Sequence, residues 1–208
     1  MGSGGRSGEP PAGWGPELNP QAAAFIETMP DFDIRPVTAK NWDDFAGLFE
    51  ARGGPHYCWC SIHRFPGGQR LSNAQKKAGM QRLVKNAIPI GVLAYEGEVA
   101  VGWCSIAPRQ TYATLERSRT MPRVTPAETP TWIVLCFFVP RHRRGGGVAH
   151  ALLQGAIAYA RAQGAKVLEG YPFDSAGTSS THRGHSNVFK EAGFRRDGRR
   201  WYLDLDPA

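Results

Sequence analysis

A short basic, glycine-rich segment, Arg141–Gly147, contains three arginines, one histidine and three glycines. The residues that follow, Val148–Ala160, place apolar side chains at helical spacing, so the segment should end at a helix N-terminus. That terminus offers unpaired N–H groups to an anion, glycines let the anion approach, and arginines add charge-assisted hydrogen bonds to phosphate. The pattern predicts a phosphate-binding loop. An ordinary strand-to-helix turn with a solvated arginine cluster is the alternative.

Two familiar nucleotide loops do not fit this segment. No Gly-Lys-Ser/Thr follows the glycines, which excludes a P-loop, and the Gly-x-Gly-x-x-Gly dinucleotide pattern is absent.

A second group of chemically versatile residues lies in residues 53–68, called the early loop below. His56, Cys58, Cys60 and His63 are residue types that bind zinc, but their spacing differs from the paired ligands of common zinc fingers. A zinc site is therefore the lesser interpretation, and no metal is expected.

The elements that must position the basic segment form a strand–helix–strand unit. Thr131–Val139 is an almost unbroken apolar run, which predicts a strand buried on both faces. A helix over 148–163 and a strand over 166–171 follow it. This order predicts two parallel strands joined by a right-handed crossover, with the basic loop at the start of the helix.

The remaining elements are expected from periodicity, caps and turns. A strand covers 32–37, and a helix starts after Asn41 with an apolar stripe of Trp42, Phe45, Leu48 and Phe49. Ser72 and Gln75 form a capping box for a second helix. Further along we expect a hairpin over 90–106, irregular loops over 108–130 and 174–184, a short helix over 186–192 and a closing hairpin over 194–205.

Composition bounds the class of protein. The chain has 208 residues, with 41% hydrophobic and 21% charged residues, as in ordinary globular proteins. Its net charge of +7 admits nucleic-acid binding, but much of the basic excess lies in the loop. No apolar run is long enough for a membrane span, and the four cysteines favour reduced thiols and a cytoplasmic location. Residues 1–30, rich in Gly and Pro, should form a flexible tail, and 31–208 a single domain.

Residues Arg144–Ala149 fit the pattern Q/R-x-x-G-x-G/A, and Ala192-Gly193-Phe194 follows downstream. Together with the order of elements, this resembles the GNAT superfamily of acetyl-CoA-dependent N-acetyltransferases, over about Asp31 to Asp206. The resemblance implies a mixed α/β (α+β) fold: a twisted, mostly antiparallel central sheet with one parallel βαβ unit, flanked by about four helices.

The resemblance also implies where acetyl-CoA binds. Its pyrophosphate would lie on the basic loop, and its pantetheine arm along the open edge of the long strand, where a backbone N–H polarises the thioester carbonyl. The implied cofactor-binding residues are Phe137, Phe138, Val139, Arg144, Gly145, Gly146, Gly147, Val148, Ala149 and Phe189.

The sequence departs from better-known members of the superfamily at both proton-transfer positions. Phe137 stands where many carry a glutamate base, and Phe189 where many carry a tyrosine acid. The remaining catalytic candidates are Glu169, Tyr171, His185 and Ser186. Glu169 could equally form a salt bridge to a loop arginine, and Tyr171 could be an aromatic residue of the core or of the cleft lining. His185 could be a surface residue, and a water chain could replace a dedicated base.

The resemblance implies that the early loop binds the acceptor, through Tyr57, Cys58, Trp59 and Cys60, unless these residues pack under the first helix. The expected function is transfer of an acetyl group from acetyl-CoA to an amine, more often on a small molecule than on a protein. A catalytically silent acyl-CoA-binding or sensor module is the alternative, and a basic nucleic-acid-binding domain a weaker one. A homodimer would be common for the superfamily.

Overall fold

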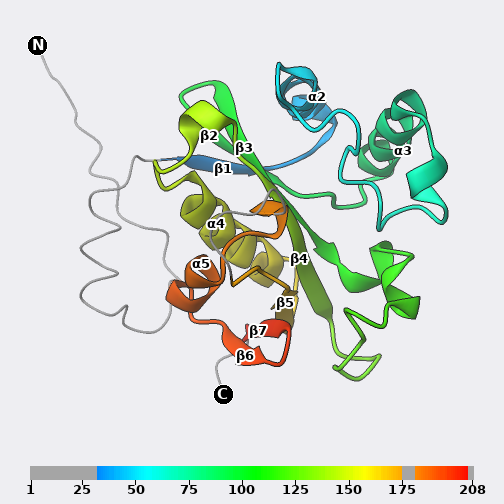
Figure 1. Cartoon of the computed structure of the whole chain (residues 1–208), viewed down its shortest axis with the longest axis vertical. Helices are drawn as coiled ribbons and strands as arrows, with labels where there is room; N and C mark the ends of the chain where they lie inside the picture. Colours follow the sequence, from blue (N-terminus) through cyan, green and yellow to red (C-terminus); the bar gives the residue numbers. More distant parts are fainter. Residues whose placement is uncertain (1–31, 175–180, 206–208) are drawn as a thin grey trace, which may run out of the picture.

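The computed structural model describes residues 32–174 and 181–205; the expected tail, 1–30, lies outside the described residues. Within them the chain forms a seven-stranded sheet of order β1-β2-β3-β4-β5-β7-β6 (Figure 1). Only β4 and β5 pair in parallel among the described strands. The strands are β1 Asp33–Pro36, β2 Val92–Glu96, β3 Val99–Pro108, β4 Thr131–Phe138, β5 Val167–Gly170, β6 Arg195–Asp197 and β7 Arg200–Asp204.

Two pairs of helices flank this sheet (Figure 1). The described α-helices are α2 Trp42–Glu50, α3 Asn73–Lys85, α4 Val148–Ala162 and α5 Ser186–Glu191. Short 3-10 helices are η1 Ala39–Asn41, η2 Gly68–Arg70, η3 Arg109–Thr111, η4 Leu115–Arg117, η5 Arg141–Arg143 and η6 Thr181–Arg183. Helices α2 and α3 lie together at one side of the sheet, and α4 and α5 at the other.

Each pair of helices covers its own apolar cluster. The α2 stripe expected from the sequence, Trp42, Phe45, Leu48 and Phe49, is buried against β2 and β3. The α4 stripe, including Leu152, Leu153 and Ala156, is buried against the opposite face. Alternating side chains of one strand therefore serve two cores: Val92 and Ala94 of β2 face α4, while Leu93 and Tyr95 face α2.

The sequence predictions of element order, sheet type and parallel pairing are confirmed. The capping box of Ser72 and Gln75 is present at the start of α3. One cap differs: the Asn41 side chain makes no capping hydrogen bond to α2 and instead completes a capping box with Thr38 at η1. An extra 3-10 turn before α2 was not visible in the periodicity.

The structural feature that positions the site is the short contact between β4 and β5. They pair only from Thr131–Val134 to Val167–Gly170, although β4 continues to Phe138. The β3–β4 register also shifts between Ser105 and Ile106, leaving Leu135 as an extra residue in β4. Such a bulge bends a strand and increases its twist. The second half of β4 therefore has an edge that no described residue of β5 covers.

Gly155 lies in the middle of α4, and we expect its replacement by alanine to destabilise the protein, the opposite of the usual effect in a helix. Glycine to alanine normally stabilises an exposed helix interior by about 1 kcal/mol. At Gly155, however, an added Cβ would lie 2.3 Å from Cγ2 of Ile34, so the helix would have to move away from β1. We expect Gly155→Ala to lower the free energy of unfolding by about 1–3 kcal/mol in urea titrations.

The matched control for this prediction is Gly47→Ala in α2, where an added Cβ meets nothing within 4 Å. It should raise the free energy of unfolding by up to about 1 kcal/mol. Equal effects of the two substitutions would contradict the close packing of α4 on β1.

Candidate functional site

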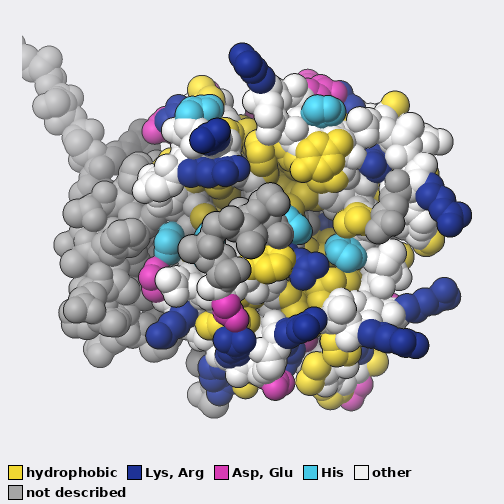
Figure 2. All heavy atoms as spheres, in the orientation of Figure 1, with side chains coloured by type: hydrophobic (Ala, Val, Ile, Leu, Met, Phe, Trp, Pro, Cys, Tyr) yellow, Lys and Arg dark blue, Asp and Glu magenta, His cyan; other side chains and the backbone are white. Residues whose placement is uncertain are grey.

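A cavity of about 660 Å³ opens where β4 leaves β5. Figure 2 shows hydrophobic side chains exposed in the hollow between the two groups of helices, with histidine and Lys or Arg side chains at its border. One end is lined by the basic loop and the start of α4, the middle by β4, and the other end by the early loop and residues 182–185.

The basic loop at one end of the cavity has the geometry of an anion site. Gly145 and Gly147 adopt positive φ angles of 83° and 79°, which glycine tolerates best. Gly147 is the N-cap of α4, and no side chain caps the helix there. The N–H groups of the first turn are therefore available to a ligand, with the helix dipole favouring negative charge.

Two arginines of this loop are held in place. Arg144 Nε donates to the carbonyl of Val139 at 3.1 Å, which ties the loop to the end of β4. Arg143 pairs at 2.5 Å with Glu96, the last residue of β2, which ties the loop to the hairpin of β2 and β3. Both arginines line the cavity.

Most of the expected cofactor residues meet at this end. The lining includes Phe137, Phe138, Val139, Arg144, Gly145, Gly147, Val148 and Ala149. Gly146 and Phe189 are not part of it. Phe189 is fully buried behind Phe137, with ring centroids 6.1 Å apart and the rings nearly perpendicular. It supports the cavity wall from behind.

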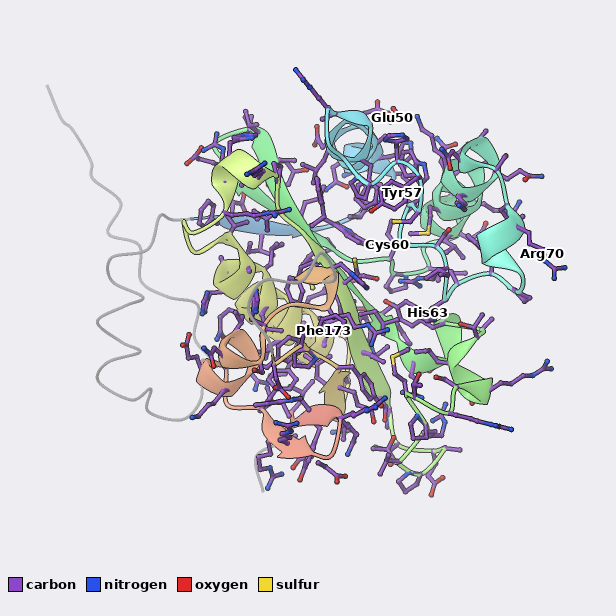
Figure 3. The ribbon with its side chains drawn as sticks, viewed as in Figure 1. Glu50, Tyr57, Cys60, His63, Arg70 and Phe173 are labelled. Carbon is purple, nitrogen blue, oxygen red and sulfur yellow. The ribbon has the colours of Figure 1, made fainter. Side chains whose placement is uncertain are left out.

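The early loop forms the opposite wall. Tyr57, Cys58, Cys60 and His63 line the cavity, and Figure 3 shows Tyr57, Cys60 and His63 in succession along this loop. The loop is fixed by buried Arg64, whose guanidinium donates to the carbonyls of Pro89 and Ile90 at 3.0 Å. These bonds fasten the loop to the residues just before β2.

Trp59 does not line the cavity. It packs under α2, the first helix, which is the alternative that the sequence left open for these residues. Its ring is buried and stacks on Phe49, with centroids 5.4 Å apart. Its backbone has φ of 50°, and Cys60 has φ of 45°, a region that bulky residues rarely occupy. The aromatic packing of Trp59 therefore holds an unusual turn that directs its two cysteine neighbours.

Glu169 lies away from the cavity lining and fully buried in an ion-pair group. Its two carboxylate oxygens accept hydrogen bonds from Arg109 Nη1 at 2.7 Å and from Arg200 Nε at 2.8 Å. Arg109 is itself fully buried. The structure thus favours the salt-bridge interpretation of Glu169 over a role as base.

Tyr171 is also a core residue. It is 5% exposed, lies outside the cavity lining, and its hydroxyl donates to the carbonyl of Pro122 at 3.5 Å. Of the other two catalytic candidates, His185 lines the cavity and Ser186 does not. A β-bridge joins His185 to Phe173, and the preceding residues His182, Arg183 and Gly184 also line the cavity.

His63 is a cavity residue that the sequence suggested only as a metal ligand. Its Nδ1 lies 3.0 Å from Thr114 Oγ1. Partial burial, with the nearby charges of Arg183 and His182, lowers the pKa of His63 below its usual value. The imidazole is therefore neutral at pH 7 and able to accept a proton.

Sequence reasoning missed several other lining residues. Ser105 lies opposite Cys136 in the β3–β4 ladder, and its hydroxyl is 3.0 Å from that of Tyr112. The alternation of β3 could have indicated which of its residues face the cavity, but the bulge beside Ser105 obscures the register. His182 and Arg183 follow an irregular segment that carries no periodic signal.

The pKa values of the two cysteines in the early loop are shifted in opposite directions. Hydrogen bonds from Cys60 and the charge of Lys76 lower the pKa of Cys58 to about 6, against the effect of burial. Burial, with hydrogen bonds to Cys136 and Cys58, raises the pKa of Cys60. Within residues 32–174 and 181–205, no three His, Cys, Asp or Glu side chains are grouped as metal ligands.

Comparison with protein families matches residues 43–176, more than half of the chain, to the acetyltransferase (GNAT) family. The chain belongs to the GNAT family. The resemblance stated from the loop and the order of elements is thereby confirmed. No curated protein matches the GNAT chain described here.

Solved structures show the same fold at low sequence identity. An N-acetyltransferase from Staphylococcus aureus Mu50 matches with a TM-score of 0.53 and 16% identity, covering 85% of this chain and 99% of its own. YncA from Salmonella typhimurium, named as a candidate acetyltransferase and solved with its cofactor acetyl-CoA, has a TM-score of 0.51, 18% identity and coverages of 85% and 95%. The aminoglycoside N-acetyltransferase AAC(6')-Iy, solved with CoA, has a TM-score of 0.52, 18% identity and coverages of 81% and 91%. At these identities the likeness establishes the GNAT fold alone.

None of the helices in the described part of the GNAT chain has the length and apolar character needed to cross a membrane.

Proposed function

We propose that the protein transfers the acetyl group of acetyl-CoA to an amine by direct attack of that amine on the thioester. The observation that carries this proposal is the continuity of the cavity. One opening beside β4 joins an anion-binding helix start to a separate, partly apolar wall in the early loop. A two-substrate transfer needs both ends within reach of one reacting centre.

The cofactor would occupy the end near α4. Its pyrophosphate would accept hydrogen bonds from N–H groups of Arg144–Ala149, and its pantetheine arm would run along the part of β4 that does not pair with β5. A backbone N–H near Phe137 would then polarise the thioester carbonyl, as an oxyanion hole does. This geometry would stabilise the negative charge that develops on the carbonyl oxygen during attack.

The acceptor would occupy the end near the early loop, and the charge of this end indicates its class. The described lining contains no Asp or Glu, whereas Arg183 and the imidazoles of His63 and His182 lie there. The Cys58 thiolate offsets the charge of Arg183, but this part of the described lining offers no carboxylate to an acceptor ammonium group. The Arg183 guanidinium could hold a carboxylate or phosphate of the acceptor by paired hydrogen bonds. We infer a small amine that carries a carboxylate or phosphate, rather than a polycation such as an aminoglycoside.

A panel of acceptors tests this function. Release of CoA from acetyl-CoA should accelerate with amino acids or amino phosphates and remain at the background rate with polyamines and aminoglycosides. CoA should be measured by chromatography, because the free cysteines of the protein react with thiol reagents. Tight binding of acetyl-CoA without turnover on any amine would support the silent module instead. Failure to bind acetyl-CoA would overturn both the acetyltransferase and the silent-module hypotheses. Binding of nucleic acid would then be tested.

His63 is the proposed proton acceptor, since it is a neutral imidazole on the acceptor wall. We expect His63→Gln to lower kcat by about 100-fold, the usual contribution of a general base. The wild-type rate should fall as pH falls through the lowered pKa of His63, below about 6.5, because the protonated ring cannot accept the amine proton. Rates of CoA release between pH 5 and pH 9 measure this limb.

His56→Gln is the matched control, since His56 is on the same loop but is exposed and outside this cavity. It should keep the rate and the pH profile. His185→Gln tests the other histidine of the wall. If the fall in rate at low pH persists in His63→Gln, the proton acceptor is His185 or water. If that fall disappears in His185→Gln alone, the proton acceptor is His185.

A cytoplasmic location and a homodimer remain expectations. Light scattering of the purified protein, with and without acetyl-CoA, measures the second.

A further inference from the structure

Three of the four cysteines lie together in one wall of the cavity. Cys58 and Cys60 come from the early loop, and Cys136 comes from β4. The Sγ atoms of Cys60 and Cys136 are 2.9 Å apart, although the residues are 76 positions apart in the sequence. The Cys60 N–H lies 3.4 Å from Cys58 Sγ. Acetyl transfer by direct attack uses none of these thiols, so the group needs an explanation of its own.

The fold holds the Cys60 thiol against β4. Trp59 and Cys60 both have positive φ, a conformation that costs non-glycine residues of order 1–3 kcal/mol each. Trp59 is held there by its buried ring, which stacks on Phe49 and also on Trp42, at 6.4 Å. The approach of Cys60 to Cys136 therefore results from packing, and not from a freely rotating surface side chain.

The thiols differ in reactivity, and this difference decides which of them reacts with an oxidant first. Cys58 is largely thiolate at pH 7, because hydrogen bonds from Cys60 and the charge of Lys76 favour its anion and bring its pKa to about 6. Cys60 is a protonated thiol, since burial and its cysteine neighbours raise its pKa. A partly exposed thiolate reacts with peroxide far faster than a thiol does.

We propose that Cys58, Cys60 and Cys136 form a thiol relay that hydrogen peroxide oxidises to a disulfide between Cys60 and Cys136. In this relay Cys58 meets the oxidant, and the bond finally formed joins the early loop to β4 in the wall of the cavity.

Hydrogen peroxide is the two-electron oxidant of this relay. The Cys58 thiolate attacks one peroxide oxygen, the O–O bond breaks, and Cys58 sulfenic acid forms as hydroxide leaves and is protonated to water. The Cys60 thiol then displaces a second water and forms a Cys58–Cys60 disulfide. Cys136 loses its proton to solvent and attacks Cys60 Sγ, which releases Cys58 as thiolate. Cys58 leaves readily because its pKa is low.

Counting and mapping thiols tests the relay directly. The reduced full-length protein is treated with one equivalent of hydrogen peroxide at low protein concentration, denatured and alkylated. The four alkylatable thiols should fall to two, and dithiothreitol should restore them. Chymotrypsin cleaves after Trp59 and so separates Cys58 from Cys60, which a tryptic digest would leave in one peptide. The linked pair should contain Cys60 and Cys136.

Single substitutions test the order of events. Cys58→Ser should slow the loss of thiols at least tenfold, and the linked pair should remain Cys60–Cys136. Cys136→Ser should stop the relay at a Cys58–Cys60 bond. Cys104→Ala is the control, because Cys104 is buried in β3 with a raised pKa and should not change the rate. Four persisting thiols, a disulfide between two molecules, or an unchanged rate in Cys58→Ser would overturn the relay.

A consequence for activity rests on the proposed acetyl transfer. The disulfide would fix the early loop beside Phe137, so the oxidised protein should transfer acetyl groups at least tenfold more slowly and recover with dithiothreitol. Because the thiol count needs no substrate, a failure of the relay and a failure of the proposed function give different results. Equal turnover by oxidised and reduced protein would overturn this consequence.

Discussion

Gly147→Asp should weaken the binding of acetyl-CoA, raising Kd by about 100-fold, equivalent to roughly 2.7 kcal/mol. Gly147 is the N-cap of α4 at the bottom of the basic loop, where the proposed pyrophosphate accepts from first-turn N–H groups. An aspartate there would offer its own carboxylate to those N–H groups and repel the phosphates. Isothermal calorimetry with acetyl-CoA measures the change.

The same helix supplies a matched control for this prediction. Gly164, just beyond the end of α4, has φ of 78°, almost equal to the 79° of Gly147, and an added Cβ there meets nothing within 4 Å. Gly164→Asp therefore introduces the same strain and charge away from the cavity, and its acetyl-CoA affinity should equal that of wild type. Equal loss of binding in both variants would attribute the effect to the stability of α4 and contradict the cofactor site.

The parts of this site that the sequence predicted depend on neighbouring residues in the chain. The glycines before α4 could be identified because helix periodicity begins directly after Gly147, and the parallel pair of β4 and β5 because a crossover helix separates two apolar runs. Such signals are local, so a single sequence carries them. The end of the cavity formed by the basic loop is therefore largely predictable from the sequence.

The early loop and the buried ion pairs of Glu169 depend on contacts between distant residues, which periodicity does not encode. Glu169 meets Arg109, 60 positions away, and Arg200, 31 positions away. Cys60 meets Cys136 only because Trp59 turns the early loop inward. A carboxylate in an apolar strand looks like a catalytic group or an ion pair from the sequence alone, and only the position of its partners decides between these readings.

Glu169→Gln should lower the free energy of unfolding by about 3–5 kcal/mol, the usual cost of leaving a buried charge without its partner. The carboxylate is fully buried and holds two guanidinium groups, from the loop after β3 and from β7. Glutamine cannot neutralise either arginine, so both charges would remain in the core. Urea unfolding measures the loss, and Glu98→Gln, in an exposed ion pair with Arg35, should have little effect on the free energy of unfolding because solvent screens that pair.

A variant that removes all three charges separates the structural role of Glu169 from a catalytic one. Replacing Arg109 and Arg200 by Met together with Glu169→Leu should recover much of the lost stability, because an apolar group of similar volume needs no desolvation of charge. If Glu169 instead accepted the amine proton, Glu169→Gln would fold with nearly wild-type stability and lose turnover. That result would return Glu169 to the reacting centre and require the acceptor to reach β5, outside the cavity lining.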